Sequence, residues 1–93
     1  MNRFRVKLFS LSTCSHCKAV KKILAQYHID VDVIDVDRLE GDTRKKALKE
    51  VKQYNDRVTF PTTVIGEKVI VGNKIDRIKT ALEASQPSTD ERG

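Results

Sequence analysis

Cys14 and Cys17 are the only cysteines in the chain, and Ser15 and His16 separate them. A stretch typical of a strand precedes the pair, and a helical pattern begins at Cys17. Two thiols at this spacing, at the start of a helix, can carry out reversible two-electron chemistry. Cys14 would attack a disulfide as a thiolate, and Cys17 would then resolve the mixed disulfide. The pair is therefore the first candidate for a reactive site.

The positions of the two thiols predict different roles for them. At a helix amino terminus, a Cys14 thiolate accepts backbone N–H donors and lies at the positive end of the helix dipole, which lowers its pKa. Cys17, one turn further along, is expected to be more buried and to stay protonated until it acts. The neighbours Thr13, Ser15 and His16 are polar, which argues against two inert thiols in a core.

His16 lies between the cysteines, and an imidazolium beside Cys14 would stabilise the thiolate further. Because a thiol of low pKa is a better leaving group, we expect a more oxidising disulfide than one with an apolar residue at this position. The alternative is an exposed histidine without effect on the thiols.

Metal binding is the competing chemistry, since Cys14, His16, Cys17 and His28 are all residue types that bind zinc. Three of them crowd one turn, and His28 lies about 15 Å away by helical rise. A closed tetrahedral site within one molecule is therefore geometrically poor, and we assign no metal ligand.

Length and composition restrict the function classes. The 93 residues are enough for one domain, expected over residues 1–85, and the polar residues 86–93 are expected to be a disordered tail. No stretch approaches the roughly 20 apolar residues of a membrane-spanning helix. No apolar run of signal-peptide length follows the basic amino terminus. We expect a cytoplasmic protein with no membrane partner. In the reducing cytosol, a close cysteine pair is more often catalytic or metal-binding than structural.

The formal net charge is +5, and much of the excess lies in residues 18–22 and 44–52. The three Phe and two Tyr residues do not interleave with these basic runs, as a base-stacking surface would require. We therefore expect no nucleic-acid partner. The two basic runs could be solvated helix faces or a patch that attracts an acidic partner.

Hydrophobic periodicity predicts the strands. Residues 4–9 alternate apolar and basic side chains, which indicates one buried face, and residues 29–37 alternate again with aspartates between. Gly66-Glu67 predicts a tight hairpin turn between strands 62–65 and 68–71.

Apolar steps of three and four residues predict three helices. The first covers residues 17–27, capped by Thr13 or Ser15, with its lysines facing solvent. The second runs to about Tyr54, capped by Asp42 or Thr43, and the third covers residues 74–84.

The resulting order is β-α-β-α-β-β-α. A helical crossover makes the first two strands parallel, and the hairpin supplies antiparallel strands. The predicted fold class is α/β, with a mixed four-stranded sheet flanked by three helices.

This order, together with Cys14-Ser-His-Cys17, Thr59-Phe60-Pro61 and Val71-Gly72, resembles the glutaredoxin family of the thioredoxin superfamily over about residues 4–84. The resemblance implies a thioredoxin-like fold and thiol–disulfide oxidoreductase activity. It implies that Pro61 is a cis-proline facing the thiols and that the Phe60 backbone pairs with the substrate's chain. From the residues alone, a trans-proline at a strand entrance is equally consistent.

The chain departs from the family pattern where glutathione would bind. Leu11 replaces the Lys or Arg that helps to hold the glutathione carboxylate, and the paired glycines are reduced to Gly72-Asn73. Asp76 is the candidate for the acidic residue that binds the glutathione amino group. The candidates for a replacement cation are Arg57, Lys49 and Lys52. The predicted substrate or glutathione contacts are Thr13, Ser15, Thr59, Phe60, Pro61, Gly72, Asn73 and Asp76.

These departures leave both glutathione and a thioredoxin reductase open as the electron donor. We expect no bound cofactor, a monomer, and disulfide-containing proteins as partners. The alternative function is a glutaredoxin-like module that binds a metal or an iron–sulfur cluster, because some glutaredoxins share a cluster between two chains. A basic interaction domain with incidental thiols is a third hypothesis.

Overall fold

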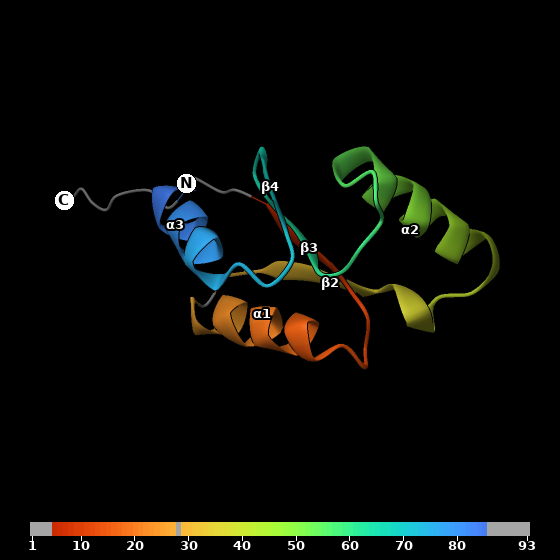
Figure 1. Cartoon of the computed structure of the whole chain (residues 1–93), viewed down its shortest axis with the longest axis horizontal. Helices are drawn as coiled ribbons and strands as arrows, with labels where there is room; N and C mark the ends of the chain where they lie inside the picture. Colours follow the sequence, from red (N-terminus) through yellow and green to blue (C-terminus); the bar gives the residue numbers. More distant parts are fainter. Residues whose placement is uncertain (1–4, 28, 86–93) are drawn as a thin grey trace.

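The predicted order of strands and helices is confirmed by the computed structural model, which describes residues 5–27 and 29–85 (Figure 1). The elements, with one short 3-10 turn η1, are β1 (Val6–Ser10), α1 (Ser15–Gln26), β2 (Val31–Asp35), η1 (Val36–Arg38), α2 (Gly41–Tyr54), β3 (Thr62–Ile65), β4 (Lys68–Val71) and α3 (Ile75–Ser85). The predicted tail 86–93, residues 1–4 of the predicted domain and the zinc candidate His28 lie outside the described residues.

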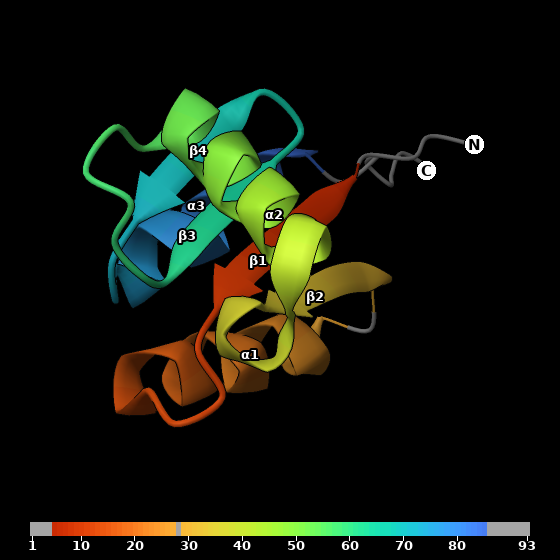
Figure 2. The same ribbon diagram turned by 90° about the vertical axis from the view of Figure 1, so that its right-hand side faces the viewer.

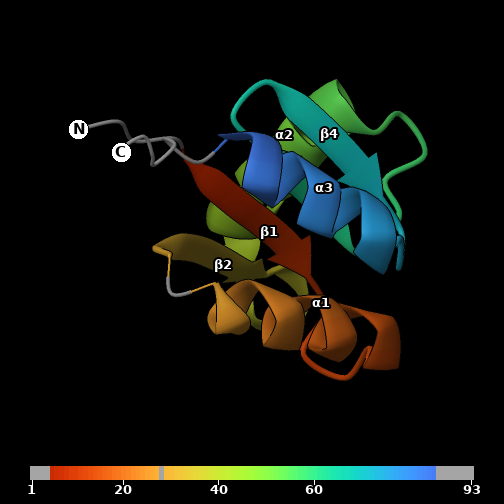
Figure 3. The ribbon, with the colours of Figure 1, turned by 90° about the vertical axis from the view of Figure 1, so that its left-hand side faces the viewer.

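The sheet has four strands in the order β2-β1-β3-β4. As predicted, β1 pairs with β2 in parallel, whereas β1–β3 and β3–β4 are antiparallel. Helix α2 covers one face of the sheet (Figure 2), and helices α1 and α3 lie on the opposite face (Figure 3). The fold class and the mixed sheet predicted from the sequence are thus confirmed.

The central strand β1 contributes to two separate cores, so the prediction that only one of its faces is buried was wrong. Val6 and Leu8 pack with residues of α1 and α3, whereas Phe9 packs with α2. Lys7, which suggested a solvent face, instead reaches across to α2, where its Nζ lies 2.6 Å from a carboxylate oxygen of Glu50. The positive charge of Lys7 on β1 is therefore paired with the carboxylate of Glu50 on α2.

The helix starts also differ from those predicted. The side-chain cap of α1 is Cys14, not Thr13 or Ser15. Helix α2 begins at Gly41 after Glu40, which makes no side-chain cap bond. The predicted caps Asp42 and Thr43 both lie within the first turn, where a carboxylate is also favourable near the positive end of the helix dipole.

Candidate active site

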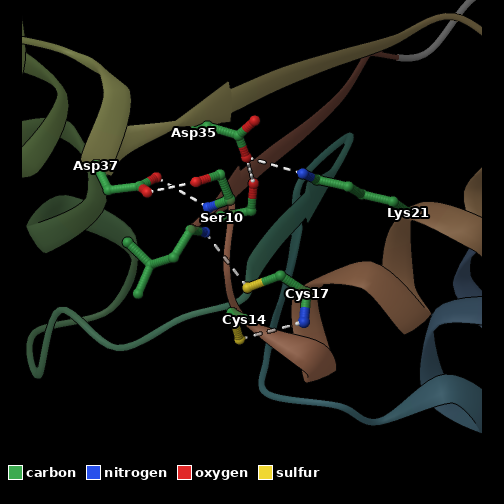
Figure 4. A network of polar contacts seen from close by, with 8 residues as sticks. Ser10, Cys14, Cys17, Lys21, Asp35 and Asp37 are labelled. Atoms are coloured by element: carbon green, nitrogen blue, oxygen red, sulfur yellow. Dashed lines mark hydrogen bonds and ion pairs between the residues drawn. The ribbon is translucent and has the colours of Figure 1, made fainter.

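Cys14 occupies the N-cap position of α1, with extended backbone angles (φ −84°, ψ 122°). Its Sγ accepts the backbone N–H of Cys17 at 3.3 Å (Figure 4). Its carbonyl accepts the backbone N–H of Lys18 at 3.0 Å. The first turn of α1 contains no acidic residue that would compete for these donors. The sulfur itself therefore caps the helix by accepting one of the N–H groups at its amino terminus.

The surroundings of Cys14 lower its pKa below the usual value of a thiol. The largest cause is the hydrogen bond from the Cys17 thiol, followed among the lowering groups by the backbone N–H groups of Cys17 and His16 and then by the charge of Lys21. Partial burial opposes them. Cys14 is only half-buried, so the more acidic thiol is also the one that a substrate can reach.

Cys17 is fully buried in the first turn of α1. Its Sγ accepts the backbone N–H of Leu11 at 3.5 Å. Burial is the largest cause that raises the pKa of Cys17 to about 11, and the hydrogen bond to Cys14 acts in the same direction. Both cysteines are free thiols. The predicted difference between a reactive outer thiol and a protonated inner one thus has a structural basis.

Lys21 forms a network that the sequence did not indicate, since its helical position had predicted a solvent face. Its Nζ lies 2.9 Å from Oδ1 of Asp35 at the end of β2, and the same carboxylate oxygen accepts the hydroxyl of the fully buried Ser10 (Figure 4). These bonds lower the pKa of Asp35, with Ser10 as the larger cause. The only sequence signal was that Lys21 follows Cys17 by one helical turn.

The loop between β1 and α1 is attached to η1. Both the N–H and the hydroxyl of Ser12 donate to the carboxylate of Asp37, at 2.8 and 2.5 Å. Leu11, at the position where the family pattern has a cation, packs against the apolar cluster beneath α2. The loop that leads to Cys14 is therefore fixed by the hydrogen bonds of Ser12 and by the apolar packing of Leu11.

The Phe60–Pro61 peptide bond is cis, as the family resemblance had implied. The carbonyl of the buried Pro61 accepts the N–H of Gly72 at 2.8 Å. Gly72 has a φ of +90°, a conformation that glycine adopts without steric cost. This bond places Gly72 beside Thr59-Phe60-Pro61, where Thr59 is exposed and Phe60 half-buried.

Asn73 joins the loop after β4 to the start of α1. Its Nδ2 lies 3.1 Å from Nδ1 of the exposed His16. The ring of His16 thus contacts Asn73, whereas the contribution of His16 to the pKa of Cys14 comes from its backbone N–H. An effect of the imidazolium on the thiolate stays a prediction.

The remaining predicted contact residues lie in different parts of the structure. Thr13 and Ser15 are exposed on either side of Cys14. Asp76 lies in the first turn of α3 and lines an open groove of about 470 Å³ between β4 and α3. The three candidate cations, Lys49, Lys52 and Arg57, are exposed. None of their side chains makes a hydrogen bond or ion pair to a predicted site residue within the described part of the chain.

Metal-ligating side chains do not cluster in the part of the chain that the structure describes. Within residues 5–27 and 29–85, no three His, Cys, Asp or Glu side chains gather as a metal site would require. Among the same residues, no helix has both the length and the apolar character needed to cross a membrane.

The comparisons with known proteins agree on one family. The family model described as Glutaredoxin matches residues 6–70. Methanoredoxin from Methanosarcina acetivorans is 40% identical, with a TM-score of 0.80, covering 84% of this chain and 83% of that one. The glutaredoxin from Methanosarcina mazei Go1 is 46% identical, with a TM-score of 0.77 and coverage of 84% and 77%.

A third solved structure, the glutaredoxin from Archaeoglobus fulgidus, is 33% identical, with a TM-score of 0.80 and coverage of 84% and 85%. No curated protein sequence matches the chain significantly. The family match spans residues 6–70 and therefore includes the cysteine pair, and the two Methanosarcina structures each cover 84% of this chain. The chain therefore belongs to the glutaredoxin family and is a small redox protein of that family.

Proposed function

We propose that the protein is a thiol–disulfide oxidoreductase that reduces protein disulfides or glutathione mixed disulfides. The asymmetry of the two thiols is the observation that carries the proposal. Cys14 is half-buried with a lowered pKa, whereas Cys17 is buried with a pKa of about 11. Because the thiolate is the nucleophile, Cys14 reacts first and Cys17 waits until a mixed disulfide has formed.

The reaction proceeds by two exchanges. The Cys14 thiolate attacks one sulfur of the substrate disulfide, forms a mixed disulfide and releases the other sulfur as a thiolate. Cys17 then gives up its proton and attacks the Cys14 sulfur, which releases the second substrate sulfur. Two electrons pass to the substrate, and a Cys14–Cys17 disulfide remains. Two donor thiols, or one dithiol, then reverse these exchanges, become oxidised to a disulfide and restore both cysteines.

We assign substrate binding to the segment Thr59, Phe60 and Pro61, with Gly72 hydrogen-bonded beside them. No hydrogen bond joins the Phe60 backbone to any other residue that the structure describes. Its N–H and carbonyl are therefore available to an extended substrate chain. Thr13 and Ser15 flank Cys14, and we assign them, with Asn73 and Asp76, to the rim of the same binding region.

The electron donor is either glutathione or a thioredoxin reductase. The apolar packing of Leu11 removes one cationic partner for the glutathione carboxylate. Electrons arrive through thiols in both cases, so the protein needs no bound cofactor. A cytoplasmic location and a monomeric state complete the proposal.

A coupled assay tests both the reaction and the donor. NADPH oxidation is followed with a protein disulfide, once with glutathione and glutathione reductase and once with thioredoxin reductase. We expect turnover with one donor system and none with Cys14→Ser. A wild-type protein that is inactive with both donors contradicts the proposal.

Cys17→Ser separates the two substrate classes. It lacks the resolving thiol, so it should lose activity on protein disulfides. It should keep its activity on glutathione mixed disulfides when glutathione is supplied, because a second glutathione thiol can then release the glutathione bound to Cys14. The same preparations, purified without oxygen, test the cluster alternative. A coloured wild-type protein that loses both its iron and its colour in Cys14→Ser would favour an iron–sulfur module.

A further inference from the structure

The turn between α2 and β3 is organised around the side chain of Asn55, which is only 7% exposed. Its Nδ2 lies 2.9 Å from the hydroxyl of Thr59, 3.2 Å from the carbonyl of Thr59 and 3.1 Å from the hydroxyl of Thr62. Its Oδ1 accepts the backbone N–H of Arg57 at 3.2 Å. One buried carboxamide thus binds the turn on both sides of Val58.

Val58 shows why the turn needs such a support. Its φ is +53°, a left-handed conformation that is uncommon for a β-branched residue. Such a conformation persists only where surrounding contacts determine it. The carbonyl of Asn55 accepts the N–H of Val58 at 2.9 Å, and Val58 packs against the apolar cluster beneath α2. Asn55 therefore holds this segment through both its backbone and its side chain.

The same bonds fix the direction of the backbone at Phe60. The Thr59 carbonyl and the Phe60 N–H belong to one planar peptide unit. That carbonyl accepts the Asn55 carboxamide and also the Thr62 hydroxyl, the latter at 2.7 Å. With the carbonyl held, the Phe60 N–H can point only to the opposite side of the peptide. Within the described ranges it has no partner of its own.

We propose that Asn55 is a positioning residue for substrate binding. Its carboxamide orients the Thr59–Phe60 peptide so that the Phe60 N–H donates to a main-chain carbonyl next to the substrate's cysteine. The inference rests on the proposed function and specifies its substrate as an extended peptide segment, bound through its main chain. A disulfide without a peptide backbone gains nothing from this arrangement.

The test compares two disulfides in single-turnover reduction by the pre-reduced protein. One substrate is a short cysteine-containing peptide disulfide, and the other is bis(2-hydroxyethyl) disulfide, which has no peptide group. In Asn55→Ala, we expect the second-order rate constant for the peptide to fall by about 10-fold, as for one lost hydrogen bond. The loss should appear as an increase in the peptide concentration that half-saturates the rate. The rate for the small disulfide and the pH profile of Cys14 alkylation should stay unchanged.

Three further variants separate positioning from folding. Thr62→Val keeps the shape of the side chain but loses its hydroxyl, and it should show a smaller loss of the same kind. Gln53→Ala, an exposed neighbour on α2, should behave as wild type. Leu48→Ala weakens the packing of α2 and should affect both substrates alike.

The rate ratio between the two substrates decides the outcome. If folded Asn55→Ala keeps the wild-type ratio while wild type reduces both disulfides, the positioning role is wrong and the proposed function stands. If Asn55→Ala does not fold, the rate ratio of Thr62→Val decides in the same way. A wild-type protein that reduces neither disulfide overturns the proposed function and the inference together.

Discussion

Helices α1 and α2 lie on opposite faces of the sheet, and their amino termini are satisfied in different ways. At α1, the side chain of Cys14 accepts a backbone N–H and the first turn has no acidic residue. At α2, Glu40 makes no side-chain cap bond and Asp42 supplies a negative charge in the first turn. One helix start is thus capped by a sulfur, whereas the other has a carboxylate in its first turn.

This difference shows what a helix must lack in order to activate a thiol. The donors and the dipole at a helix start stabilise whichever anion is present. A carboxylate in the first turn of α1 would compete with the thiolate of Cys14 and repel it. Each helix is also joined to the sheet by one ion pair, Lys21–Asp35 at 2.9 Å and Lys7–Glu50 at 2.6 Å. Both helices are therefore attached to the sheet by an ion pair, and they differ in the groups at their amino termini.

The strongest way to break the comparison is Cys14→Ser. We expect a complete loss of disulfide reduction, because a serine hydroxyl is not a nucleophile towards disulfides. Serine is a favourable N-cap residue, so the melting temperature should stay close to that of wild type. Activity assays and thermal unfolding check the two expectations. A variant that retains activity would show that Cys14 is not the nucleophile.

The second test compares the ion pairs through Asp35→Asn and Glu50→Gln. Asp35 also accepts the buried Ser10 hydroxyl, so its replacement should cost about 1–3 kcal/mol of unfolding free energy at pH 7. The more exposed pair with Glu50 should cost less than about 1 kcal/mol. Urea unfolding of both variants measures the difference, and equal losses would contradict it.

The pH dependence of the Asp35 contribution follows from its lowered pKa. A carboxylate whose pKa is lower in the folded state contributes fully above its ordinary pKa of about 4. The contribution is lost as the pH falls through the folded pKa. The difference between wild type and Asp35→Asn should therefore shrink below about pH 4.

The third test sharpens the account of the Cys14 thiolate. The Cys17 thiol is the largest cause that lowers the pKa of Cys14, so Cys17→Ala should raise that pKa. Alkylation of Cys14 at pH 7 should therefore slow, because a smaller fraction of the thiol is then ionised. His16→Ala keeps its backbone N–H and should slow alkylation by less than Cys17→Ala. A larger effect of His16→Ala would support the imidazolium instead.

The smallest expected effect is at the start of α2. Glu40 has extended backbone angles (φ −135°, ψ 157°), which suit a serine N-cap. Glu40→Ser should raise the free energy of unfolding by about 0.5–1 kcal/mol and leave the alkylation of Cys14 unchanged. Chemical unfolding and alkylation kinetics check both points. A change in alkylation would mean that the two helix starts are coupled.

The fold could be predicted because its signals are local. The hairpin strands, residues 62–65 and 68–71, match the structure because the tight turn at Gly66-Glu67 sets where one strand ends and the next begins. The second face of β1 was missed because Lys7 is paired with Glu50, a residue 43 positions away. No local pattern shows such a pairing.

The reactive residues of the candidate site could be predicted, whereas most of the side chains that position them could not. The cysteine pair follows from its motif, and the cis-proline was implied by the resemblance to the glutaredoxin family. The Lys21–Asp35–Ser10 network depends on β2 lying beside the start of α1, which spacing does not reveal. The role of Asn55 could not be seen in the sequence, because its partners Thr59 and Thr62 meet it only after the chain has turned.

The N–H of Cys17 is bound to the sulfur of Cys14, and this gives the protein a built-in isotopic reporter. A charged sulfur is a strong acceptor, whereas a sulfur in a disulfide carries no charge and accepts weakly. The amide hydrogen should therefore exchange with deuterium more slowly in the reduced protein than after Cys14 has been oxidised. One backbone hydrogen would thus record the progress of the reaction without any attached label.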